Sequence, residues 1–249
     1  MIRWIVLGLL FWLAFVISQI PAAWGGYLMT RDTPLALSGI SGTLWQGSAG
    51  MASVSIDGKH YALGQLSWRI KPMSLLGLAP CAEIKTDLER QQVAGTACVG
   101  MGGSLRLTDT SLNLPASLIQ GLPEPTKITG QISAQIQSLR LKGQTLKNLE
   151  GKLSWTQARL HNGQSWLQLG AFAADLSETQ EGEIRADVFS LEGPIDLAGN
   201  VVMPLTGGIH IDGEFAFTDT FAREVQAEQW LPLMAEPLDN GKHRLRLSL

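Results

Sequence analysis

The sequence contains few of the residues that build reactive or metal-binding sites. Only 2 Cys, 4 His and 2 Tyr occur among 249 residues. It also has no Gly-x-Ser-x-Gly elbow, no phosphate-binding Walker loop, no His-Glu-x-x-His and no Ser-x-x-Lys. The alternating His210, Asp212 and Glu214 would share one strand face, but a single strand without a second ligand cluster is typical of a solvated surface. We therefore predict no catalytic residue, no metal and no cofactor.

A basic patch is also lacking. Residues 26–249 contain 18 of the 19 Lys and Arg and all 22 Asp and Glu, so this part carries a formal net charge of −4. Proteins that bind nucleic acid usually show a basic stripe or cluster. The charge distribution thus excludes nucleic acid as an expected partner.

One long apolar run stands at the start of the chain. Residues 1–24 contain a single charged side chain, Arg3, and nearly reach the length of about 20 residues that a membrane-spanning helix needs. We predict an N-terminal membrane anchor over 1–24, and its bulky residues include Trp4, Leu10, Trp12 and Phe15. The positive N-terminus predicts that residues 25–249 lie outside the cytoplasm. A cleaved signal sequence ending near Ala23 is the alternative, and it gives the same orientation.

The remainder of the chain indicates mainly β structure. Glycine and proline are frequent, with 27 and 11 residues, and apolar and polar residues alternate over much of the length. An Asp57-Gly58 turn predicts a hairpin in which Val54 opposes Tyr61. The same register places Ile56 opposite Lys59 and Ala52 opposite Leu63. The expected fold is a curved antiparallel β-sheet, of half-barrel or roll type.

Further strands are expected around Leu105, Ile132 to Ile136, Leu149 to Trp155, Ile184 to Val188, Ile209 to Phe217 and Leu245 to Leu249. In the last of these, Arg244 and Arg246 are expected to face water. Outside the anchor, a helix is expected from Asp219 or Thr220 to Trp230, ending at Pro232. A short helical turn is expected after Pro115.

A short phrase recurs within the sequence. Gly-Gln-Leu-Ser-Trp at 64–68 is followed 87 residues later by Gly-Lys-Leu-Ser-Trp at 151–155. A duplication would divide the β domain into related halves at about 25–114 and 126–249, whereas a chance strand pattern would leave one domain. Both interpretations stay open from the sequence.

The two cysteines, Cys81 and Cys98, are predicted to form a disulfide. An even pair in an exported chain is more often bonded than free. The charged, turn-like segment between them, at 87–92, indicates a hairpin with the cysteines opposite each other near its base.

Residues 37–49, Leu-Ser-Gly-Ile-Ser-Gly-Thr-Leu-Trp-Gln-Gly-Ser-Ala, together with Gly-Gln-Leu-Ser-Trp and the Pro-Met-Ser-Leu-Leu-Gly at 72–77, carry a family resemblance. The chain resembles the protein N family of bacterial type II secretion systems. Its segment at 139–155 is also similar to AsmA-type envelope proteins.

The first resemblance implies an accessory, non-enzymatic part of the machine that exports folded proteins across the outer membrane. It implies an inner-membrane anchor, a periplasmic β domain, and partners in the inner-membrane platform or outer-membrane channel. The second implies a phospholipid-binding apolar groove. Trp45, Trp68 and Trp155 are the candidate residues for either surface, and packing in a closed core is the third possibility for them.

Overall fold

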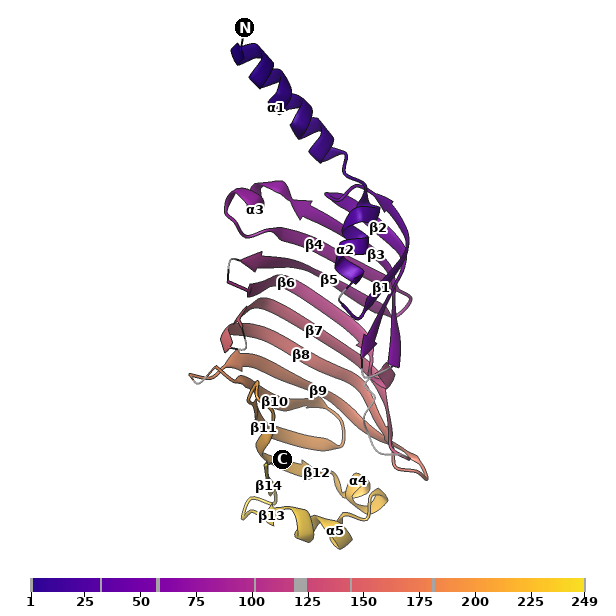
Figure 1. Ribbon diagram of the computed structural model, residues 1–249. Helices are drawn as coiled ribbons and strands as arrows, with labels where there is room; N and C mark the ends of the chain where they lie inside the picture. Colours follow the sequence, from indigo (N-terminus) through magenta and orange to yellow (C-terminus); the bar gives the residue numbers. More distant parts are fainter. Residues whose placement is uncertain are drawn as a thin grey trace. The chain divides into compact units, whose positions relative to one another are not determined.

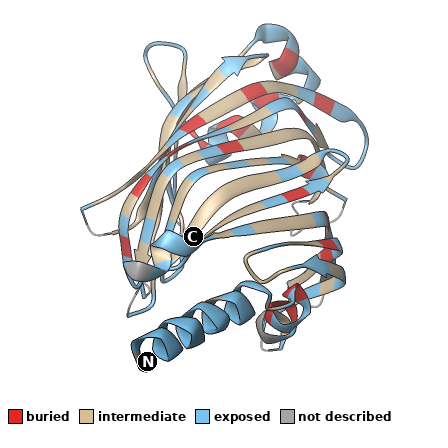
Figure 2. Ribbon diagram, turned by 90° about the horizontal axis from the view of Figure 1, so that it is seen from above, coloured by how far each residue is buried: buried red, intermediate tan, exposed pale blue. Residues whose placement is uncertain are grey.

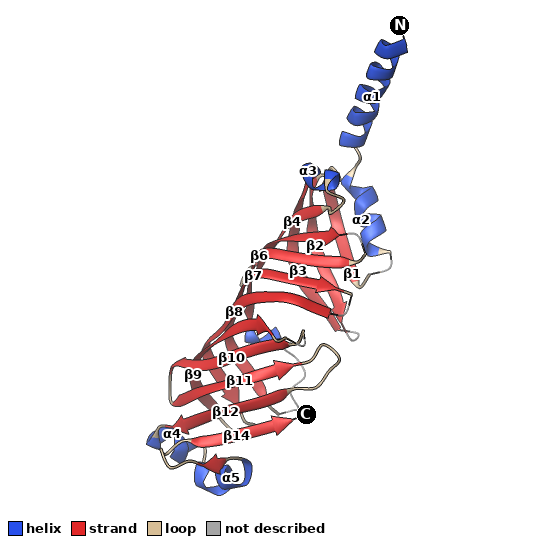
Figure 3. Ribbon diagram, turned by 90° about the vertical axis from the view of Figure 1, so that its left-hand side faces the viewer, coloured by secondary structure: helices blue, strands red, loops and turns tan. Residues whose placement is uncertain are grey.

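The computed structural model of the protein describes residues 2–31, 33–56, 59–100, 102–118, 125–143, 145–180 and 182–248. The chain forms two compact units, Met1–Met101 and Gly102–Leu249. Both consist mainly of antiparallel β-strands, drawn red in Figure 3, which confirms the predicted mainly β class. The related halves expected at 25–114 and 126–249 stay a prediction.

The N-terminal unit begins with two helices and continues as a sheet (Figure 1). Its elements are α1 (Ile2–Ser18), α2 (Ala22–Thr30), β1 (Leu35–Gly42), β2 (Gln46–Ile56), β3 (Lys59–Lys71), α3 (Pro72–Leu76), β4 (Cys81–Leu88) and β5 (Gln91–Gly100). The strands lie in chain order, and each pairs antiparallel with the next. Such a meander needs only short connections, which the sequence supplies.

The expected anchor over 1–24 is not one continuous helix. Helix α1 has 17 residues, and the backbone is extended at Pro21, where α2 begins. Proline removes a helical N–H donor and disfavours helix at the residue before it, which explains the break. Ala22 is buried, and a Cβ on Gly26 would come within 2.4 Å of Ile40 Cδ1, so α2 packs closely on the sheet. Residues 22–24 therefore belong to the sheet-packed helix.

The predicted hairpin register holds from its turn as far as Ser53. Val54 pairs with Tyr61 and Ile56 with Lys59, as predicted, while the turn at 57–58 lies outside the described residues. Ala52, however, pairs with Gly64 and not with Leu63, because the register shifts by one residue. Gly64 has φ +76°, a conformation that favours glycine and accommodates the bulge.

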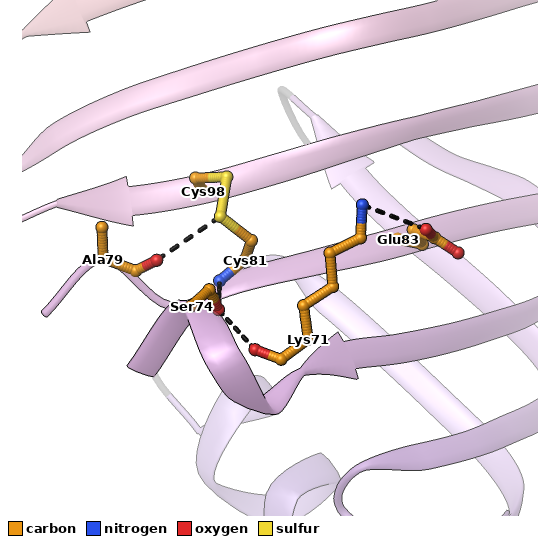
Figure 4. Close-up of a disulfide and its surroundings, with 6 residues drawn as sticks. All are labelled: Lys71, Ser74, Ala79, Cys81, Glu83 and Cys98. Atoms are coloured by element: carbon orange, nitrogen blue, oxygen red, sulfur yellow. Dashed lines mark hydrogen bonds and ion pairs between the residues drawn. A yellow bond between two sulfur atoms is a disulfide. The ribbon is translucent and has the colours of Figure 1, made fainter. Parts of the chain in front are cut away.

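The predicted disulfide between Cys81 and Cys98 is present. The two residues are direct partners across β4 and β5, with 4.0 Å between their Cα atoms. Leu88 and Gln91 flank the hairpin turn, and Glu89 there has φ +43°. Figure 4 shows the bridge beside Ser74, whose Oγ accepts a hydrogen bond from the Cys81 N–H at 2.8 Å. The disulfide thus links two strands of the N-terminal sheet and lies next to α3.

The C-terminal unit is a second antiparallel array with helices near its end. Its elements are β6 (Ser104–Pro115), η1 (Ala116–Leu118), β7 (Lys127–Lys142), β8 (Thr145–His161), β9 (Trp166–Glu178), β10 (Ile184–Glu192), β11 (Ile195–Met203), β12 (His210–Phe217), α4 (Asp219–Glu224), α5 (Ala227–Met234), β13 (Glu236–Pro237) and β14 (His243–Ser248). Strands β6 to β12 lie in chain order, and β14 then pairs with β12 and β13. The expected strands and the turn after Pro115 are confirmed, except that β12 begins at His210 and not at Ile209, and Leu249 lies outside the described residues.

The single helix expected from Asp219 to Trp230 is wrong. Two helices, α4 and α5, are separated at Gln226, which has φ +51°, and Pro232 lies inside α5 and does not end it. The break turns Ala227 and Leu231 onto Phe215 and Phe217 of β12. Burial of this apolar cluster explains why tertiary packing overrides the continuous helical pattern.

The expectation that Arg244 faces water is confirmed in part, because its side chain is 33% exposed and also pairs with Asp212. Its Nε and Nη2 atoms donate to the two carboxylate oxygens of Asp212 at 3.0 and 2.9 Å across β14 and β12. These hydrogen bonds are the main reason that the pKa of Asp212 is lowered. Arg246 is exposed, with its Nε 3.7 Å from the same carboxylate. Arg244 and Arg246 lie two residues apart on β14 and contact the same carboxylate differently. Arg244 forms two hydrogen bonds with it, whereas Arg246 makes one longer contact.

Replacing both cysteines, as in Cys81→Ser/Cys98→Ser, should lower the free energy of unfolding by about 3 kcal/mol, because the cross-link restricts a loop of this size in the unfolded chain. Urea unfolding of oxidised and reduced protein measures the effect. Reductant should destabilise the natural protein by a similar amount and leave the double variant unchanged. An unfolding midpoint that does not respond to reductant in either protein would contradict the structural role of the disulfide.

Candidate functional site

The turn between β1 and β2 connects α1 to the sheet. Gly42 enters the turn with φ +90°, and the Thr43 N–H donates to the Gln46 carbonyl at 2.9 Å. The Leu44 N–H donates to the carbonyl of Ile20 at 2.8 Å. Trp45 Nε1 donates to the carbonyl of Ile17 in the last turn of α1 at 2.9 Å. Because the last helical carbonyls have no partner within the helix, these bonds fix the end of α1 against this turn.

Trp68 joins the same turn from β3. Its Nε1 donates to the Leu44 carbonyl at 3.0 Å. The indole lies over Gly47, its direct partner on β2, where a Cβ would stand 2.5 Å from Trp68 Cζ2. Trp45 and Trp68 are therefore brought together around one turn of the Gly-Thr-Leu-Trp-Gln-Gly segment.

Trp155 has a similar environment in the C-terminal unit. Its Nε1 donates to the Thr129 carbonyl of the preceding strand, β7, at 3.1 Å. A Cβ on the adjacent Gly130 would stand 2.7 Å from the same nitrogen. Its ring lies 6.1 Å from that of Phe172 on β9. Thus each tryptophan of the repeated phrase covers a glycine of the preceding strand. Trp155 donates to a carbonyl on that strand, and Trp68 donates to one in the turn before it.

The three tryptophans are less buried than the residues of a closed core. Trp45, Trp68 and Trp155 are each of intermediate exposure. Among the described residues, no large side chain is fully buried, and alanine predominates among the buried apolar residues. Figure 2 shows only scattered buried positions, in red, along the strands. An interaction or groove role for the three tryptophans stays a prediction.

The four residues assigned to the anchor lie exposed on α1. Relative exposures are 79% for Trp4 and 59% for each of Leu10, Trp12 and Phe15, and the helix is pale blue throughout Figure 2. Within the described part of the chain, no helix meets the length and apolarity needed to cross a membrane.

The described residues contain no group of three or more His, Cys, Asp or Glu suited to holding a metal ion. His210 and Asp212 lie on one face of β12. His210 Nδ1 is 3.0 Å from Ser248 Oγ, and Asp212 accepts a hydrogen bond from Arg244. The side chains there are engaged in cross-strand pairing.

A polar hollow with a volume of about 400 Å³ lies on β1 to β4, and the candidate Trp68 is one of its lining residues. The sequence analysis missed the polar residues around it. Its lining side chains include Ser41, Gln46, Ser48, Ser67, Arg69, Glu83 and Lys85. The sequence does show polar residues at alternate positions in these strands. It does not show which of them lie side by side, because that depends on the register between strands. Lys71 Nζ lies 3.1 Å from the Glu83 carboxylate, and its hydrogen bond is the main cause of the lowered pKa of Glu83.

Comparison with known proteins identifies the family. The model for type II secretion system protein N matches residues 33–246. The chain is 27% identical over 253 residues to type II secretion system protein N of Aeromonas hydrophila, an alignment that covers 94% of this chain and 92% of that protein. It is 31% identical over 171 residues to the Vibrio cholerae protein of the same name, which covers 65% of each chain. No solved structure gives a significant match. The chain therefore belongs to the type II secretion system protein N family.

Proposed function

We propose that this protein is an accessory, non-enzymatic component of the type II secretion machinery that acts through protein–protein contacts in the periplasm. Membership of the protein N family supports a place in the secretion system. Partners in the inner-membrane platform or the outer-membrane channel are part of the proposal.

The observation that carries the contact role is the outer side of β1. Within the described part of the N-terminal unit, β1 pairs with β2 alone. The second side of such a strand presents main-chain donors and acceptors that an added strand can pair with. Ala36 and Ser38 are exposed on β1, and Gly39, with φ +64°, interrupts its regular conformation. The segment before Gly39 is thus the part best suited to receive a partner strand.

The proposal places α1 in the inner membrane and both sheets in the periplasm. Large apolar side chains project from α1 without a protein layer over them, as the exposure of Trp4, Leu10 and Phe15 shows. The disulfide supports an oxidising compartment for the N-terminal sheet, because disulfides persist outside the cytoplasm and are rare within it.

A phospholipid-binding groove is the second candidate, supported by the apolar face of the C-terminal unit. Strand register places Ile132, Trp155 and Phe172 in one row across β7 to β9. The adjacent row includes Leu153, which is 36% exposed. Acyl chains are the occupant that such an uncharged row would favour.

Leu10→Arg should release the protein from membranes during carbonate extraction. A charged residue at the centre of a membrane-embedded helix costs about 2.5–3.5 kcal/mol. Met73→Arg on α3 is the matched control, since Met73 is also an exposed apolar residue, and it should stay in the membrane pellet. Extraction of the natural protein itself would contradict the anchor.

In-cell photocrosslinking from β1 and β8 separates the two candidate functions. A photoreactive residue at Ala36 should give adducts with secretion components, because it stands on β1, which is paired on one side only. Lys152 is the control: it is exposed but lies on a strand paired on both sides, and it should give none. Leu153, on the opposite face, should give phospholipid adducts only if the groove is occupied. Lipid adducts from Leu153 without protein adducts from Ala36 would replace the first candidate with the second.

A further inference from the structure

We propose that the polar hollow on β1 to β4 is a binding site for a phosphate group. This site is independent of which secretion component contacts β1. It would make the N-terminal sheet a ligand-binding element as well as an interaction surface.

Strand register assembles the hollow from two adjacent rows. Ser41, Ser48, Ser67 and Lys85 form one row, because each is the direct cross-strand partner of the next. Gln46, Arg69 and Glu83 form the other in the same way. Direct partners share a face, and residues two apart on one strand do too. Hydroxyl, amide, guanidinium and ammonium donors therefore converge on one side of the sheet.

Among the described residues that line the hollow, two cations stand against one carboxylate. That carboxylate is Glu83, and it forms an ion pair with Lys71, which Figure 4 draws as a dashed line. The charges of Arg69 and Lys85 also lower the pKa of Glu83, but neither side chain forms a direct ion pair or a side-chain hydrogen bond with any described residue. Both side chains are exposed. Two cations thus remain available to an anion, in a chain whose formal net charge is −3.

The donor set fits phosphate better than a carboxylate. Arg69 can offer two parallel N–H donors, and Lys85 adds a mobile ammonium. Ser48 and Ser67 are only partly exposed. Ser48 Oγ lies 3.0 Å from Ser41 Oγ, so this hydrogen-bonded pair keeps one hydroxyl proton to donate, and Ser67 can donate another. A phosphate presents three or more oxygens to satisfy these groups, whereas a carboxylate presents two.

The position of the hollow suggests two sources of phosphate. Gly42 and Gln46, which line it, flank the turn bonded to the end of α1. A phospholipid headgroup could therefore reach the site if α1 enters a membrane. A soluble phosphate ester is the other source, since the same donors would hold it.

The test compares Arg69→Gln/Lys85→Gln with a matched control, Lys147→Gln/Arg159→Gln. The control removes the same two charges from exposed positions on β8. Full-length proteins in detergent micelles are titrated calorimetrically with inorganic phosphate. The Arg69/Lys85 variant should bind at least about tenfold more weakly, which corresponds to the loss of a single charge-assisted bond, and the control should keep the natural affinity. Unchanged binding by both variants, or equal weakening of both, would overturn the proposal.

Lipid composition then assigns the source. Each protein is reconstituted in nanodiscs containing phosphatidylcholine and phosphatidylglycerol, and the lipids retained after detergent extraction are quantified. A headgroup site predicts enrichment of phosphatidylglycerol that only the Arg69/Lys85 variant loses. Loss of phosphate binding without a change in retained lipid supports the same site for a soluble ester. Matching thermal unfolding midpoints show that each variant is folded, as expected for exposed side chains.

Discussion

Close packing of an indole on a glycine of the neighbouring strand is the constraint on which the strands of both units depend. Trp68 covers Gly47 in one unit, and Trp155 covers Gly130 in the other. Each indole also donates to a backbone carbonyl, that of Thr129 next to Gly130 and that of Leu44 in the turn before Gly47. No large side chain is fully buried among the described residues. Contacts between neighbouring strands, such as these indole–glycine contacts, therefore contribute much of the stability of each unit. A side chain in place of either glycine would push the indole away and break its hydrogen bond.

The same constraint explains the segment that carries the family resemblance. In Gly-Thr-Leu-Trp-Gln-Gly, Gly42 provides the turn and Gly47 provides the space for Trp68. Leu44 supplies the carbonyl that accepts from Trp68, and Trp45 donates to the end of α1. One six-residue segment thus fixes the apolar helix, the β1–β2 turn and β3 together. The polar hollow is lined in part by Gly42 and Gln46 of this segment, so the same contacts hold these lining residues in place.

Much of the fold could be predicted from local pattern. Alternation located the strands, and the charged turn between Cys81 and Cys98 indicated their pairing across a hairpin. The errors occurred where one residue changes the backbone path. The shift at Gly64 moved Ala52 to a new partner, and the positive φ of Gln226 divided a helix that the sequence pattern made continuous. Each depends on packing against another element, which the local sequence does not specify.

The candidate surfaces were less accessible to prediction for a related reason. Trp45, Trp68 and Trp155 stood out by residue type, yet their hydrogen-bond acceptors lie 24 to 28 residues earlier in the chain. Arg69 and Lys85 looked like ordinary surface charges. The register of β1 to β4 is what places Arg69 and Lys85 beside three serines. It also brings Lys71 close enough to Glu83 to form an ion pair.

The most direct test of the packing constraint compares the unfolding free energies of Gly130→Ala and Gly207→Ala. Both glycines have similar positive φ, +119° and +105°, so alanine strains the backbone at both. At Gly130 the added Cβ would stand 2.6 Å from the Thr156 carbonyl oxygen and 2.7 Å from Trp155 Nε1, whereas nothing lies within 4 Å at Gly207. The account predicts that Gly130→Ala is more destabilising by about 1–3 kcal/mol, the usual cost of overpacking. Equal destabilisation by the two substitutions would contradict it.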